Sequence, residues 1–152
     1  MSWERQSGLS LLILLECVMY FTKEELEKST TAKDKGIDNT IPEKYTENVN
    51  RLISLLDKIR EKWGSPIIVN SGYRCPQLNS VVGGSKTSQH LTASAADIHP
   101  KKGSIKQLFN CILEMIKEGE IEVGQLIDEY NYSWVHVSIP DFKHSNQVLH
   151  IK

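Results

Sequence analysis

WVHVSI, at residues 134–139, alternates β-branched apolar side chains with a tryptophan, a histidine and a serine. Successive side chains of a strand point to opposite faces of a sheet, so this alternation predicts a half-buried strand. Its two valines and its isoleucine are expected to face a core, and the other three side chains to face away from it. His136 then lies on the polar face of an otherwise buried strand, where an imidazole needs a polar partner.

A second stretch, AADIH at residues 95–99, shows the same alternation and places Asp97 and His99 on one face. His90 precedes Asp97 in the chain. Zinc binds imidazole nitrogen and carboxylate oxygen, and catalytic zinc sites combine three protein ligands with one water. His90, Asp97 and His136 offer ligand atoms of these kinds, but each residue taken alone is weak evidence for a metal site. His99 is either an exposed strand histidine or a residue that orients a ligand from outside the set.

The rest of the chain predicts two amphipathic helices, at residues 42–63 and 105–119, and a shorter helix capped by Thr22. Polar segments 29–39 and 71–96 lack a helical stripe and are expected to be loops. Further strands are expected at residues 67–70, 95–99, 123–127, 133–139 and 147–151. Helices early and short strands late predict an α+β fold, with a small antiparallel sheet that carries the site and packs against the helices.

Composition places few limits on function. A chain of 152 residues is expected to form one domain, and 39% hydrophobic and 24% charged residues are ordinary for a globular protein. A net charge of -1 includes no basic excess that would indicate a nucleic-acid partner. Three widely spaced cysteines, none in a Cys-x-x-Cys pair, indicate neither a disulfide framework nor a thiolate zinc site.

Residues 1–18 allow three interpretations. Arg5 followed by the apolar run 9–15 imitates a signal peptide, but Glu16 interrupts the run and no small-residue cleavage site follows. The run is also too short to span a bilayer as a helix. The alternatives are an extension upstream of a natural start at Met19, an amphipathic helix, or an export signal. The domain itself is expected to cover residues 19–152.

Three segments, taken in order, resemble a known family. They are Ser71-Gly72-Tyr73-Arg74, Ser88-Gln89-His90 with Ala95-Ala96-Asp97, and Trp134-Val135-His136. They are similar to the zinc D-Ala-D-Ala carboxypeptidase family, which includes bacterial murein peptidases and phage endolysins and shares its core fold with the hedgehog signalling domain. The resemblance extends from about Phe21 to the C-terminus.

The resemblance implies a role for each matching residue. His90, Asp97 and His136 would be the ligands of a zinc cofactor. Arg74 matches an arginine that lies beside the metal and contacts a substrate carbonyl or carboxylate, a task suited to a charged planar fork. Ser88 is a candidate substrate contact, although it could equally cap a turn. Gln125, which lies outside the matching segments, is a further candidate substrate contact.

The chain departs from the family pattern at one position. Several branches carry a carboxylate three residues before the last ligand, where it acts as the general base, but this chain has Ser133 there. The nearest upstream acids are Asp128 and Glu129, which a strand would place on opposite faces. Glu129, on the face of Gln125, is the preferred base, and Asp128 is the alternative.

The resemblance implies metal-assisted hydrolysis of peptidoglycan stem peptides, with the D-Ala-D-Ala bond as the expected target. The alternatives are a phage-type murein endopeptidase and a non-catalytic zinc-binding module of the same fold. Synthesis in the cytoplasm and action on the cell wall after export or lysis are expected. The sequence does not distinguish carboxypeptidase from endopeptidase, and it does not give the export route or the oligomeric state.

Overall fold

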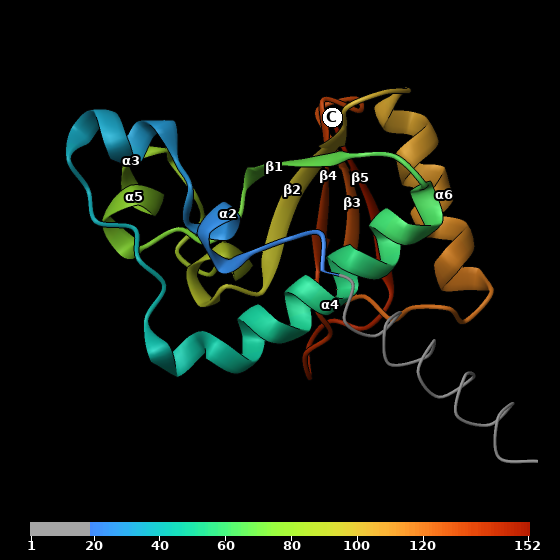
Figure 1. The fold of residues 1–152 in the computed structure, drawn as a ribbon, viewed down its shortest axis with the longest axis horizontal. Coiled ribbons are helices and arrows are strands. Elements are labelled where there is room, and N and C mark those ends of the chain that lie inside the picture. Colours follow the sequence, from blue (N-terminus) through green and yellow to red (C-terminus); the bar gives the residue numbers. More distant parts are fainter. Residues whose placement is uncertain (1–18) are drawn as a thin grey trace, which may run out of the picture.

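One five-stranded sheet organises the computed structural model, which describes residues 19–152 (Figure 1). Its strand order is β1-β2-β4-β3-β5, so β2, β4 and β3 lie inside the sheet. The strands are β1 (Ile67–Ser71), β2 (Ala95–Pro100), β3 (Gln125–Glu129), β4 (Trp134–Ser138) and β5 (Gln147–Ile151). The expected antiparallel pairing holds for β1–β2, β2–β4 and β3–β4, whereas the edge strand β5 runs parallel to β3.

The short helices lie before β1 or between β1 and β2, and the two longer helices pack against the sheet. The helices are α2 (Lys23–Glu27), α3 (Thr30–Lys35), α4 (Thr46–Trp63), α5 (Pro76–Val81) and α6 (Ile105–Lys117), with 3-10 turns η1 (Glu43–Tyr45) and η2 (Gln89–Thr92). Thr22 caps α2 as predicted, since its Oγ1 accepts a hydrogen bond from the Glu25 amide at 3.2 Å. Gly64 ends α4 in the left-handed conformation, which a residue without Cβ adopts at little cost. An α+β fold is therefore confirmed.

The hydrophobic core lies between one face of the sheet and helices α4 and α6, which Figure 1 shows beside the strands. Alternation in β4 directs Val135 and Val137 into this core, and both are fully buried, as predicted. Burying such side chains contributes roughly 1.5–3 kcal/mol each relative to exposure. The opposite face of the sheet, which carries His136, is thus left for polar groups. Facing core side chains from the two helices include Leu52, Leu56, Ile59, Leu108 and Ile112.

Two predicted loops contain helices. Segment 29–39 includes α3, whose capping bonds come from Ser29 at its start and from left-handed Gly36 at its end. Segment 71–96 includes α5 and η2. These helices are short and bury few apolar side chains, so end capping, and not an apolar stripe, marks them in the sequence.

Residues 1–18 lie outside the described residues, so the three interpretations of this segment stay predictions. Across residues 19–152, no helix combines the length and apolar character needed to cross a bilayer.

Asn39 connects the N-terminal helices to the loop that follows β1. Its side chain is 7% exposed. Nδ2 donates to the carbonyls of Glu27 at 2.8 Å and Tyr73 at 2.9 Å, and Oδ1 accepts from the Cys75 amide at 2.8 Å. Asn39 therefore holds the backbone on both sides of Arg74.

Replacing Asn39 with leucine should lower the free energy of unfolding by about 3 kcal/mol, because three buried backbone groups lose their partner. Urea unfolding measures the change. Asn110→Leu, at an exposed position of α6, is the matched control and should stay within about 0.5 kcal/mol of the wild type. Equal stability of the two variants would contradict this role for Asn39.

Candidate metal centre

The pairing register of the sheet brings the first two predicted ligands together. Asp97 of β2 lies directly opposite His136 of β4, and His136 lies opposite Ile127 of β3. Directly opposed residues of antiparallel strands point to the same face. Asp97 and His136 therefore project side by side from the face that α4 and α6 leave uncovered.

His90 completes the group from the turn η2. One ligand atom from each of His90, Asp97 and His136 lies within 4.8 Å of the others. Asp97 bridges the two imidazoles, with Oδ2 at 3.3 Å from His90 Nε2 and Oδ1 at 3.1 Å from His136 Nδ1. Both histidines are buried, at 2% and 7% exposure, and the Asp97 side chain is 14% exposed, so the group reaches the surface mainly at Asp97.

The surroundings of Asp97 favour its charged form. Burial by itself would raise the pKa of this carboxyl, but hydrogen bonds and charge from His136 and His90 hold that pKa well below its usual range. Asp97 is therefore a carboxylate at neutral pH, the form that binds metal. Two imidazole nitrogens and one carboxylate oxygen match the preference of zinc and leave a position for water or substrate.

A family model described as Peptidase M15 matches residues 19–138. The chain belongs to the peptidase M15 family. No curated protein matches the chain. Peptidases of this family depend on zinc, so the chain is a zinc metallopeptidase, and His90, Asp97 and His136 are placed to hold its ion. The resemblance seen in the sequence is thus confirmed at the level of the zinc peptidase family.

Arg74 lies beside this group. Its backbone amide donates to the His90 carbonyl at 3.0 Å, and its Nη2 donates to Ser88 Oγ at 3.4 Å. Burial lowers the pKa of Arg74, while the nearby charges of Asp97 and Glu129 raise it. Its Nε is buried and has no hydrogen-bond partner among the described residues. The hydrogen-bonding capacity of the guanidinium is therefore not fully satisfied by the described residues.

The other two predicted substrate contacts have partners within the protein. Ser88 caps η2, because its Oγ accepts from the His90 amide at 3.2 Å. The Gln125 backbone amide donates to Ser138 Oγ at 2.9 Å, and the Gln125 Nε2 donates to Gln147 Oε1 at 2.7 Å. Ser88 thus adjoins a ligand, whereas Gln125 lies farther along the sheet and is tied to β5.

The two candidate bases lie on opposite faces of β3. Glu129 is opposite Trp134 on the face of the metal group, and its Oε2 accepts from Trp134 Nε1 at 2.9 Å. Asp128 is 5% exposed on the core face, where its Oδ2 lies 3.1 Å from His150 Nδ1. Ser133 donates to the Tyr130 carbonyl at 2.7 Å. Of the two acids, only Glu129 shares a sheet face with the ligands.

Each ligand histidine also has a contact at the ring nitrogen that faces away from Asp97, and the sequence did not predict these outer contacts. His90 Nδ1 lies 2.6 Å from the Gly72 carbonyl oxygen, and His136 Nε2 lies 3.2 Å from Gln89 Oε1. A Cβ on Gly72 would meet the Leu26 backbone oxygen at 2.6 Å, so only glycine lets α2 approach the ligand loop.

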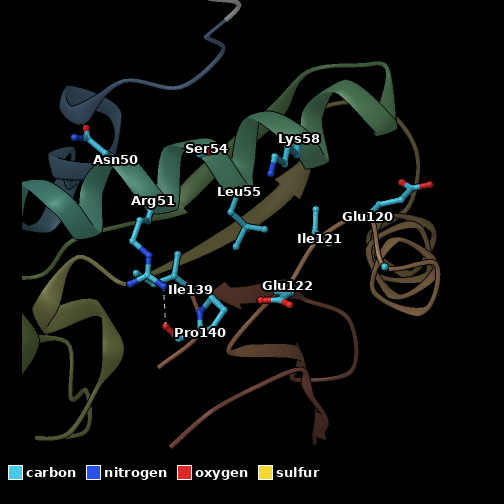
Figure 2. A pocket seen from close by; sticks show the side chains of 11 residues that line it. Asn50, Arg51, Ser54, Leu55, Lys58, Glu120, Ile121, Glu122, Ile139 and Pro140 are labelled. Atoms are coloured by element: carbon cyan, nitrogen blue, oxygen red, sulfur yellow. Dashed lines mark hydrogen bonds between the residues drawn. The ribbon is translucent and has the colours of Figure 1, made fainter. Parts of the chain in front are cut away.

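The pocket in Figure 2 is lined by residues other than the metal ligands. It has a volume of about 540 Å³ and lies between α4 and the chain segments around Glu120 and Pro140. Arg51 reaches across it to donate to the Pro140 carbonyl at 3.1 Å. None of the three ligands lines it.

Purified protein should contain about one zinc ion per chain, and His136→Ala should abolish tight binding because two ligands are too few for a stable site. Elemental analysis after dialysis against a weak chelator measures occupancy. His144→Ala is a suitable control, since that histidine contacts Asp141 in a separate turn. Full zinc occupancy in His136→Ala would refute the ligand assignment.

Proposed function

We propose that this zinc peptidase hydrolyses peptidoglycan stem peptides and acts as a D-Ala-D-Ala carboxypeptidase on the cell wall, after export or lysis. The observation that carries the proposal is the meeting of Arg74 and Glu129 at the metal group. Membership of the M15 family supports the reaction class. A half-buried arginine beside Asp97 and Glu129 supports a substrate that ends in a carboxylate, because a guanidinium can bind a carboxylate with two parallel hydrogen bonds.

Glu129 is the proposed general base. When bound, zinc supplies Lewis acidity, which polarises the scissile carbonyl and makes water a nucleophile at neutral pH. Glu129 takes a proton from that water and passes it to the leaving amine. The Trp134 indole holds Oε2 at 2.9 Å, so Oε1 can exchange the proton while the carboxylate keeps its orientation.

Arg74 is proposed to bind the substrate's terminal carboxylate or the oxyanion that develops on the attacked carbonyl. Its backbone is held by His90 on one side and by the Asn39 bonds to the flanking residues. A half-buried cation interacts more strongly with an anion than an exposed one does. Arg74 is therefore suited to fix a substrate end at a set distance from the metal group.

Two alternatives depend on the role of Arg74 and on the identity of residue 133. If Arg74 serves only the oxyanion, no free carboxylate is needed at the substrate end, and a phage-type murein endopeptidase results. Ser133 in place of the usual carboxylate favours a non-catalytic zinc-binding module. Glu129, beside Arg74 and on the ligand face, supports catalysis over that second alternative.

The zinc-loaded protein should release free D-Ala from a murein pentapeptide, as measured by chromatography of the products. An internal cut without D-Ala release would establish the endopeptidase alternative. Absence of any cleavage, with zinc content confirmed, would establish the non-catalytic module.

Glu129→Gln should lower kcat roughly 100-fold with little change in zinc content, because the amide keeps the size but cannot accept the proton. Asp128→Asn is the matched control. Its side chain faces the core and should affect the melting temperature more than turnover. Near-normal kcat in Glu129→Gln would remove this residue from the mechanism.

Arg74→Ala should raise KM more than it lowers kcat if the guanidinium binds a ground-state carboxylate. Steady-state kinetics on the pentapeptide separate the two effects. An equal fall in kcat and kcat/KM would assign Arg74 to the transition-state oxyanion and favour the endopeptidase. Unchanged kinetics would exclude both roles.

A further inference from the structure

The two ligand histidines are oriented by different nitrogens. His90 directs Nε2 toward Asp97 and Nδ1 toward the Gly72 carbonyl. His136 does the reverse, with Nδ1 3.1 Å from Asp97 Oδ1 and Nε2 3.2 Å from Gln89 Oε1. A neutral imidazole has one nitrogen that donates and one that accepts or binds metal. The oxygen acceptor on the outer nitrogen therefore decides which nitrogen faces the ion.

We propose that Gln89 is a positioning residue of the metal centre, which holds the proton of His136 on Nε2 and so makes Nδ1 the metal-binding atom. For His90 the same task is done by the Gly72 carbonyl, which substitution cannot remove. For His136 it is done by a side chain. The chain therefore offers one outer contact of its zinc site that mutation can test directly.

The position of Gln89 suits this role. Its backbone carbonyl accepts from the Ser94 amide at 3.1 Å, which fixes the residue in η2 beside His90. Its Nε2 is buried and has no hydrogen-bond partner among the described residues. The one side-chain hydrogen bond found for Gln89 is that to His136. The contact with His136 therefore explains why an amide side chain is buried at position 89.

The opposite assignment has a distinct consequence. If the amide nitrogen of Gln89 faced His136, it would donate to Nε2, and the imidazole proton would move to Nδ1. That proton would point at Asp97, and Nδ1 could not bind an ion. The two orientations of the amide therefore predict different metal-binding nitrogens, and the nitrogen can be identified in solution.

Zinc affinity is the first readout, measured by competition with a chromophoric chelator. Gln89→Leu should weaken zinc binding by about 10- to 100-fold, as loss of an outer contact to a ligand histidine typically does. Gln89→Glu keeps an acceptor oxygen and should restore affinity to within about threefold of the wild type, or tighten it. Gln77→Leu, on the exposed side of α5, is the control and should bind as the wild type does.

The second readout is nitrogen NMR of the wild-type protein loaded with cadmium in place of zinc. Coupling to the metal is expected at His136 Nδ1 and His90 Nε2. Coupling at His136 Nε2 would overturn the proposal, and so would wild-type zinc affinity in Gln89→Leu. If Gln89→Leu does not fold, the proposal is tested by the NMR coupling in the wild type and by the zinc affinity of Gln89→Glu. The inference rests on the metal centre, and neither readout uses a peptide, so failure of the proposed substrate leaves it testable.

Discussion

The opposition of Asp97 and His136 across β2 and β4 is the constraint on which the site depends. Side chains alternate along a strand, so a slip of one residue in this pairing would turn His136 into the core and Val137 toward the site. The apolar side chains that pack on α4 and α6 therefore also fix the polar group. Burial of these apolar side chains fixes the pairing register of β2 and β4, and that register places Asp97 beside His136.

The same face gathers the groups that complete the centre. β4 contributes His136 and Trp134, β3 contributes Glu129, and the two turns that follow β1 contribute Arg74 and His90. The ligand strands are interior strands of the sheet, held on both sides by neighbours. Rigid elements thus carry Asp97 and His136, while loop residues are held by individual hydrogen bonds. The bonds of Asn39 around Arg74 are of this kind.

The sequence predicted the elements that are defined by the periodicity of their own apolar side chains. Alternation in residues 134–139 gave the direction of His136, and the helical stripes gave α4 and α6. Helix α3 was missed because it buries only Ala32 and depends on its caps. The parallel pairing of β5 was missed because strand direction within a sheet is a tertiary property. Gln89 lies within one of the segments that resemble the family, but its contact with His136 could not be predicted because the two residues are 47 positions apart along the chain.

The positions of the ligands along the chain also affect how the protein can open locally. Asp97 and His136 are 39 positions apart, and the chain between them forms α6, β3 and the turn into β4. An ion held by both residues closes this stretch into a loop, as a disulfide would, and removes conformational freedom from the open chain. Any opening that separates β2 from β4 would then have to release the ion. Zinc would therefore protect the amides of β2 and β4 against the hydrogen exchange that requires these strands to part, whereas a local opening of α6, which leaves the ligands together, would not be slowed.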